Sequence, residues 1–174
     1  MKTIILLILF SITSCSWAGG GELRTVDHVD VPRYIGKWYA ISSLPQFFTR
    51  KCLGQTADYA IINTQTISVL NTCLKSKGKT TITGEAVVTN AQTNAELDVR
   101  FNNFFTRLFR VVGDYNIIKL DKDYRFVTVG SRDRKSLWIM SRTPTMPQNI
   151  YDEYIKDALA QGFSVNKLVL SKFK

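Results

Sequence analysis

The sequence predicts an all-β domain, an eight-stranded antiparallel up-and-down barrel with a C-terminal α-helix packed outside it and a ninth strand. Two observations support this fold class. Short segments of strand character recur at fairly even spacing between turn residues, and a single segment has a convincing helical pattern. Closing the strands into a barrel removes the sheet edges that such a series would otherwise expose. An eight-stranded barrel has room for packed side chains or for one small ligand.

The first eight segments show the composition and the alternation of strands. In ELDVRF, residues 96–101, the apolar Leu97, Val99 and Phe101 alternate with charged residues and therefore share one face. We predict strands at residues 37–45, 54–62, 66–74, 80–89, 95–101, 112–120, 124–130 and 136–142.

The helix is predicted at about residues 147–161. Pro147 suits the first helical position, and Gly162 is placed to end the helix. An apolar stripe at helical spacing would pack this helix against the sheet; it comprises Tyr151, Tyr154, Ile155, Ala158 and Leu159. A last strand is predicted at about residues 164–170.

Length and composition indicate one folded domain. The chain has 174 residues, of which 45% are hydrophobic, so it is long enough for one substantial core and too apolar for a disordered protein. The formal net charge of +9 favours an acidic partner, which the charge alone leaves open among nucleic acid, an anionic membrane and acidic small molecules.

The N-terminus indicates export. Residues 1–14 hold an apolar run that is too short to span a bilayer and suits a signal peptide. The run meets Cys15 in ITSC, which resembles a bacterial lipobox, so we expect Cys15 to carry lipid and residues 15–27 to form a flexible tether. Ser16 follows instead of Asp, which suggests sorting to the outer membrane. The alternative is cleavage after Ala18, which would leave a secreted or periplasmic protein.

Cysteine usage supports the same compartment. If Cys15 carries lipid, Cys52 and Cys73 remain, either as a disulfide in an oxidising compartment or as two buried thiols. A disulfide here would add roughly 3 kcal/mol of stability. We expect no metal site, because the sequence has no CxxC motif and His28 is the only histidine.

Three sequence blocks resemble the conserved blocks of lipocalins. VPRYIGKWYAI (31–41) resembles the opening GxW signature, NIIKLDKDYRFVTV (116–129) the second block and SLWIMSRTPTM (136–146) the third. The similarity covers about residues 28–170 and is strongest to the bacterial outer-membrane lipocalins of the apolipoprotein D-like branch. We therefore expect residues 28–174 to form a lipocalin barrel.

The resemblance implies structural roles for several residues. In lipocalins the tryptophan of the first block lies at the closed floor of the barrel, under the arginine of the third. Carried over, Gly36, Trp38 and Arg142 belong to the floor, with a cation–π contact worth about 0.5–2 kcal/mol. Cys52 and Cys73 also fit the placement of cysteines on neighbouring strands in some bacterial members, which favours the disulfide.

In this topology the loops after the first, third, fifth and seventh strands surround the open mouth. These loops hold ten cations and one acid, Asp133, so the positive charge is predicted to gather there. The cations are Arg50, Lys51, Lys75, Lys77, Lys79, Arg107, Arg110, Arg132, Arg134 and Lys135.

The segment RFNNFFTRLFR (100–110) is predicted to end the fifth strand and to form the loop after it. Its apolar side chains would line the opening or fold back into a core, and a bound acyl chain or a bilayer would cover them; they are Phe104, Phe105, Leu108 and Phe109. Arg107 and Arg110 would meet the anionic end of the same molecule.

The remaining ligand contacts are expected on the inner face of the barrel. We predict that this face carries Ala40, Ser42, Leu97, Val99, Phe101, Asn116 and Ile118. Asn116 would need a polar partner there, which is either a ligand headgroup or a water molecule or Tyr59.

The sequence thus favours a non-catalytic protein without a cofactor that binds fatty acids or lysophospholipids. It would be lipid-anchored at the outer membrane, facing the periplasm, and would touch the membrane with its anchor and its basic mouth. A lipid-modifying lipocalin is the alternative, although the sequence has no GxSxG motif and no second histidine. Haem or a retinoid-like cargo and a homodimer stay open, whereas export argues against nucleic acid.

Overall fold

The computed structural model describes residues 21–102 and 112–173. The predicted signal peptide, Cys15 and the first part of the tether lie outside the described residues. So does the predicted aromatic and basic loop, with Phe104, Phe105, Arg107, Leu108, Phe109 and Arg110. The predictions for these residues therefore stay predictions.

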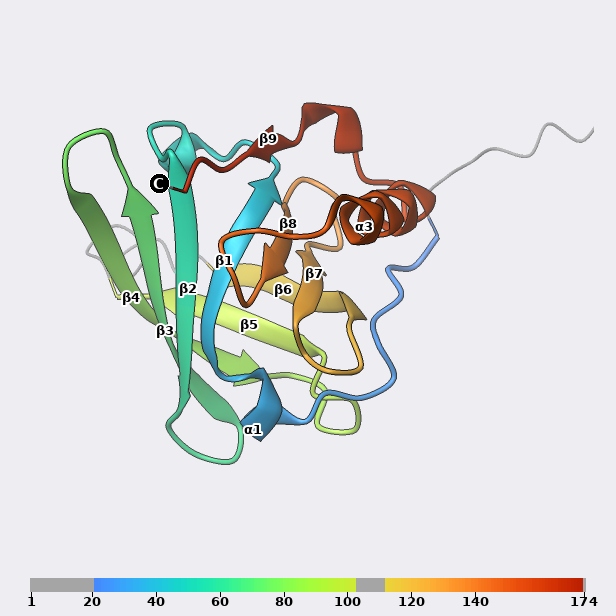
Figure 1. Ribbon diagram of the computed structural model, residues 1–174. Helices are drawn as coiled ribbons and strands as arrows, with labels where there is room; N and C mark the ends of the chain where they lie inside the picture. Colours follow the sequence, from blue (N-terminus) through green and yellow to red (C-terminus); the bar gives the residue numbers. More distant parts are fainter. Residues whose placement is uncertain (1–20, 103–111, 174) are drawn as a thin grey trace, which may run out of the picture.

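Eight antiparallel strands form a closed barrel, which confirms the predicted fold class (Figure 1). Consecutive strands pair in order, and β1 pairs with β2 on one side and with β8 on the other. The strands are β1 (Gly36–Ser43), β2 (Gly54–Ile61), β3 (Thr66–Leu74), β4 (Lys79–Val88), β5 (Glu96–Phe101), β6 (Val112–Leu120), β7 (Phe126–Gly130) and β8 (Leu137–Ser141).

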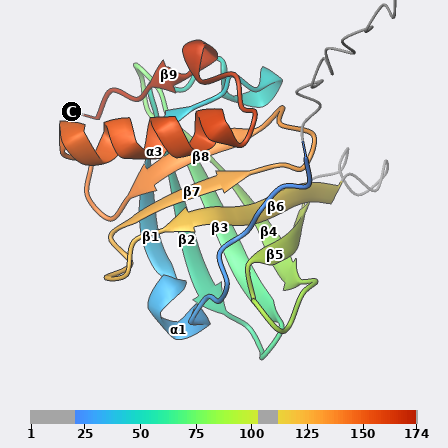
Figure 2. The ribbon, with the colours of Figure 1, turned by 90° about the vertical axis from the view of Figure 1, so that its right-hand side faces the viewer.

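A C-terminal helix, α3 (Gln148–Ala160), packs outside the barrel across β7 and β8 (Figure 2). Its buried Tyr154 contacts Phe126 and Ile139, and its buried Ala158 belongs to a second cluster under the helix end. Pro147 was predicted as the first helical residue and is instead the N-cap, so the helix begins one residue later than predicted. Gly162 (φ +88°) follows the end of the helix. No helix in the described part of the chain is long and apolar enough to cross a membrane.

The ninth strand is shorter than predicted. A 3-10 turn, η2 (Val165–Lys167), occupies the first part of the predicted segment, and β9 (Val169–Leu170) pairs with Ser42 and Ser43 of β1. Because β1 already pairs with β2 and β8 along most of its length, β9 lies outside the closed circuit, beside the end of β1.

A short helix that the strand pattern did not predict, α1 (Val31–Tyr34), precedes β1 at the lower end of the barrel in Figure 1. The side chain of Asp30 caps it by accepting a hydrogen bond from the Arg33 amide at 3.4 Å. The helix places the buried side chain of Tyr34 against the ring of Trp38, with 5.3 Å between the ring centres. This end of the barrel is therefore filled.

Candidate functional site

The inner face of the barrel is largely apolar and is filled at one end, and we call the interior that this face surrounds the cup. On β4 the inward-facing Val88 and Ala86 are buried, Ile82 is half-buried and Thr80 is exposed. On β2, Tyr59 and Ala57 are buried whereas Gln55 is half-buried. Since exposure rises along both strands in the direction away from α1, the cup opens at the end opposite this helix.

Three tyrosines form the bottom of the cup. The hydroxyl of Tyr115 is 2.7 Å from that of Tyr34 and 3.1 Å from that of Tyr59, and the rings of Tyr34 and Tyr59 stack. Burial raises the pKa of Tyr59 to about 12 and raises the pKa of Tyr34 and of Tyr115 well above the usual value. The bottom of the cup is therefore neutral at physiological pH.

The ring of Trp38 lies beneath these tyrosines and is covered by Arg142. The guanidinium carbon is 3.8 Å from the ring centre, which confirms the contact implied by the family resemblance. The guanidinium also donates hydrogen bonds to five backbone carbonyls, those of Arg33, Tyr34, Ile35, Lys37 and Tyr124. It thus ties α1, the start of β1 and the β6–β7 turn together.

Gly36 makes room for this guanidinium. Its φ of +91° lies in the region that favours glycine, and a Cβ at this position would come within 3.4 Å of the Arg142 Nη1 atom. The predicted floor residues Gly36, Trp38 and Arg142 therefore act as one structural unit below the cup, and their role is to close it.

The structure places four of the predicted wall residues on the inside. Ala40, Leu97 and Val99 belong to the apolar cluster within the barrel, and Phe101 packs against that cluster. That they contact a ligand stays a prediction.

The prediction was wrong for Ser42, Ile118 and Asn116. A β-bulge between Ala40 and Ser42 turns Ser42 outward, where its hydroxyl accepts a hydrogen bond from Tyr151 of α3 at 2.9 Å. Ile118 packs in the cluster under the end of α3. Asn116 faces outward too, and donates hydrogen bonds to Asp114 at 2.8 Å and to the Gly130 carbonyl at 3.1 Å.

Alternation misled the prediction on β6 because both faces of this strand are buried. Tyr115 and Ile117 face the cup, while the intervening positions are covered from outside by α3 and by the segment before α1, whose Val26 amide bonds the Ile117 carbonyl. A strand buried on both faces carries no clear polar side from which its inner face can be read.

Sequence reasoning missed three polar residues on the inner wall. The Gln55 amide donates to the Ser43 hydroxyl at 3.0 Å, high in the cup. Asn71, which pairs with Ala57 and Ile82, has a buried side-chain oxygen without a hydrogen-bond partner in the described part of the protein. The alternation Ile67, Val69, Asn71 on β3 was the signal that would have placed Asn71 inside.

The positive charge at the mouth is less uniform than predicted. In the β7–β8 loop, Arg132 pairs with Asp114 at 2.6 Å and with Glu96 at 2.5 Å, and hydrogen bonds from Asn90 and Arg132 hold the pKa of Glu96 below its usual value. Lys135 lies 3.6 Å from Asp133.

Arg134 in the same loop is also engaged, because it donates hydrogen bonds to the backbone carbonyls of Gln161, Arg132 and Gly21. Arg107 and Arg110 lie outside the described residues. The five cations of the other two loops have no ion pair with a described residue; these are Arg50, Lys51, Lys75, Lys77 and Lys79.

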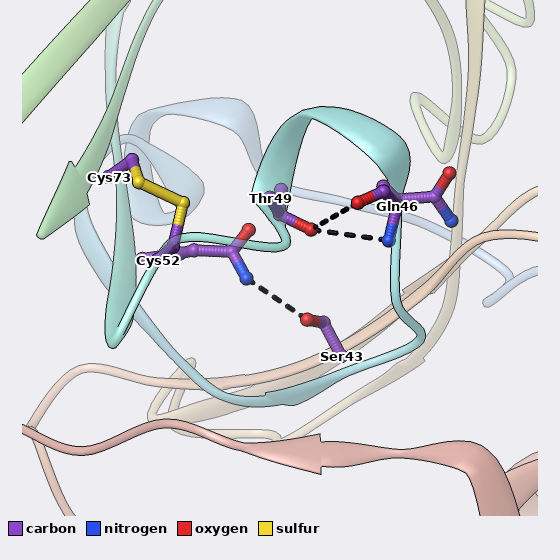
Figure 3. The surroundings of a disulfide bond; sticks show 6 residues. Ser43, Gln46, Thr49, Cys52 and Cys73 are labelled. Carbon is purple, nitrogen blue, oxygen red and sulfur yellow. Dashed lines mark hydrogen bonds between the residues drawn. A yellow bond between two sulfur atoms is a disulfide. The ribbon is translucent and has the colours of Figure 1, made fainter. Parts of the chain in front are cut away.

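The predicted disulfide is confirmed and joins the β1–β2 loop to the end of β3 (Figure 3). Cys52 ends the β1–β2 loop, and Cys73 lies near the end of β3, with 5.1 Å between their Cα atoms. The same loop contains the 3-10 turn η1 (Phe47–Thr49), in which the Thr49 hydroxyl contacts the backbone of Gln46. On this side of the rim, the β1–β2 loop is thus covalently tied to the strand that leads into the β3–β4 loop.

Comparison with known proteins identifies the chain at the level of sequence. The family described as "Lipocalin-like domain" matches residues 29–172. The chain is 34% identical over 172 residues to the outer membrane lipoprotein Blc of Citrobacter freundii, covering 94% of this chain and 90% of that protein. It is 28% identical over 153 residues to apolipoprotein D of Bos taurus, covering 83% and 77% of the two chains.

The fold is similar to that of insecticyanin from the tobacco hornworm Manduca sexta. The TM-score is 0.69 at 14% sequence identity, and the superposition covers 88% of this chain and 86% of that one. At this identity the likeness concerns the architecture of the barrel.

Proposed function

Because the chain belongs to the lipocalin family, we propose that its cup binds one small hydrophobic ligand with an acyl chain, namely a fatty acid or a lysophospholipid. The role would be storage, transfer or repair of lipids at the outer membrane. It is a binding role, without a chemical step.

The single observation that carries this proposal is the apolar, one-ended cup. Its lower wall is made of buried aliphatic side chains, and its bottom is sealed by Tyr34, Tyr59 and Tyr115. An acyl chain gains about 0.8 kcal/mol for each methylene group that leaves water. A chain that enters such a cup has only one way to lie, with its polar end toward the opening.

The distribution of charge supports an anionic polar end. The bottom of the cup is neutral, since the three tyrosines keep their protons, and five cations without an ion pair to a described residue lie beside the opening. A carboxylate or phosphate at the mouth would be within the field of these cations, and charge-assisted hydrogen bonds to such groups are stronger than neutral ones.

The location at the outer membrane is supported by sequence. The relative from Citrobacter freundii is named an outer membrane lipoprotein, and Cys15 follows an apolar run in the manner of a lipobox. A role without catalysis is supported by the disulfide, because neither Cys52 nor Cys73 is left as a free thiol that could act as a nucleophile.

A titration tests the proposal. The chain from Ser16 onward keeps every described residue, and it would be titrated with lysophospholipid, a free fatty acid and a fatty alcohol of equal length, each below its micellar concentration. Tryptophan fluorescence is the readout. We expect saturable micromolar binding with preference for the two anions. Absence of saturable binding to all three would remove lipid carriage as the function, and equal affinities would contradict recognition of charge at the mouth.

A further inference from the structure

Two adjacent aromatic side chains stand out from the rim. In η1 the exposed fraction is 84% for Phe47 and 71% for Phe48. Both are large apolar groups for which solvent exposure is costly, and a contiguous apolar patch of this kind typically marks an interaction site. Nothing in the proposed cup requires them.

The loop that carries the two rings is held in place from several sides. The Thr49 hydroxyl and the Gln46 backbone close η1 at 3.2 Å, and the Cys52 amide bonds the Thr49 carbonyl at 2.9 Å. The disulfide then fixes Cys52 to β3, as Figure 3 shows. The turn that carries the two rings is therefore held by hydrogen bonds and by the disulfide, and it keeps the rings exposed at the rim.

The two loops that carry the rings and lie beside them hold basic residues and no acidic ones. Residues 43–57 and 70–84, which include both loops and the strand ends that carry them, contain five cations and no acidic residue. The guanidinium of Arg50 lies 5.7 Å from the centre of the Phe47 ring. The Leu53 amide bonds the Leu74 carbonyl at 2.7 Å, so the cations of both loops lie on the same side of the mouth.

We propose that these groups form a membrane-docking surface for an anionic lipid bilayer. The surface is defined by Phe47, Phe48, Arg50, Lys51, Lys75, Lys77 and Lys79. The two rings enter the boundary between headgroups and acyl chains, while the cations contact the anionic headgroups. Docking in this way turns the mouth of the cup toward the bilayer. The entry of a ligand from the bilayer into the cup rests on the proposed function, whereas the docking itself does not.

The positive charge of the docking surface favours an anionic bilayer over a second copy of the chain as its partner. A symmetric pairing through the docking surface would bring the five cations of one copy against the same five of the other. An anionic bilayer satisfies both halves of the surface, because it offers an apolar interior to the rings and negative headgroups to the cations.

Cosedimentation with vesicles tests the proposal on the chain from Ser16 onward, which lacks a lipid anchor. Vesicles of phosphatidylcholine mixed with phosphatidylglycerol are compared with vesicles of phosphatidylcholine alone. We expect binding to the anionic vesicles. Phe47→Ser combined with Phe48→Ser should weaken it by about tenfold or more. Lys75→Gln with Lys77→Gln should weaken it by about fivefold for each cation removed.

A matched control comes from the other end of the barrel. Ile61 and Ile62 at the β2–β3 turn are 47% and 51% exposed, so Ile61→Ser with Ile62→Ser removes similar exposed apolar groups without touching the docking surface. This variant should bind vesicles like the parent chain. The phenylalanine and isoleucine variants should keep their affinity for monomeric fatty acid in solution, which separates failure of docking from failure of the cup.

The proposal would be overturned if the parent chain did not bind anionic vesicles, or if the phenylalanine variant bound them as the parent does. It would equally be overturned if the phenylalanine and isoleucine variants lost the same amount of vesicle binding. Self-association that disappears in the phenylalanine variant would also overturn it, because a second copy would then be the partner; gel filtration of each variant measures this.

Discussion

Among single residues, Arg142 joins several parts of the closed end of the barrel. Its guanidinium reaches five carbonyls of three segments and lies over the ring of Trp38. A lysine has the same charge but lacks the planar fork of donors.

We expect Arg142→Lys to lower the free energy of unfolding by about 2–4 kcal/mol, since several carbonyls, three of them in part-buried hydrogen bonds, lose a donor. Urea unfolding measures the loss. Arg33→Lys is the control, because the Arg33 guanidinium also stacks on a ring, that of Tyr124 at 4.2 Å, but bonds a single carbonyl, that of Lys122. A loss no larger than the control's would show that the carbonyl network contributes little.

The buried tyrosines predict how stability depends on alkaline pH. Tyr59 has a folded-state pKa of about 12, against 10.0 for a free tyrosine. The unfolded chain therefore releases its proton first, and the stability that Tyr59 contributes is complete below pH 10 and is lost as the pH rises toward 12. From Tyr59 alone the loss at pH 12 is about 2 kcal/mol.

Urea unfolding at pH 8 and at pH 11 measures this dependence, and phenolate absorbance shows how many tyrosines ionise in the folded protein at each pH. Tyr59→Phe should make the decline with pH shallower. A wild-type protein whose stability is unchanged between pH 8 and pH 11 would contradict the burial of these hydroxyls.

At the scale of elements, the disulfide joins the β1–β2 loop to the end of β3 across 21 residues of sequence. Replacing both cysteines, Cys52→Ser with Cys73→Ser, should lower the free energy of unfolding by about 3 kcal/mol, because the unfolded chain regains the freedom of the closed loop. Ligand affinity should change little, since the bottom and lower wall of the cup are made elsewhere.

Thermal or urea unfolding of the double serine variant is compared with that of the parent chain under reducing conditions. The two should agree. A variant as stable as the oxidised parent would show that the loop is already ordered without the bond.

The elements themselves were predicted well where one face of a strand is polar. The observed β2, β3 and β5 lie within one residue of the predicted segments, because alternation and turn residues mark both their faces and their ends. The bounds of β6 were also predicted correctly, but its inner face was not, because both of its faces are covered. The β-bulge that turns Ser42 outward was not predicted either. The pattern also missed α1, since four residues are too few for a helical period.

At the scale of the whole molecule, the barrel has two dissimilar ends. One is filled by α1 and by the stacked side chains of Trp38 and Arg142, and the other is open and carries Phe47 and Phe48. Topology and sequence sufficed to place the basic β1–β2, β3–β4 and β7–β8 loops at the open end. They did not reveal that Arg132 is neutralised by carboxylates of β5 and β6, because those partners are distant in sequence.

The central claim is that the ligand lies inside the cup, and Gly113 offers the most direct way to test it. Gly113 is on the inner face of β6 opposite Val99, and a Cβ there would make only ordinary contacts at 3.6 Å or more, so a side chain is tolerated. Val112, its neighbour, faces outward and is exposed. Gly113→Phe therefore places a ring in the cup, whereas Val112→Phe places the same ring outside.

The decisive measurement is a fatty-acid titration of the two phenylalanine variants, each first shown by urea unfolding to be folded. Gly113→Phe should bind about tenfold more weakly or worse, because the ring displaces methylene groups of the ligand, while Val112→Phe should bind like the parent chain. If Gly113→Phe binds with the parent's affinity, the acyl chain does not occupy the cup, and the proposed function is wrong.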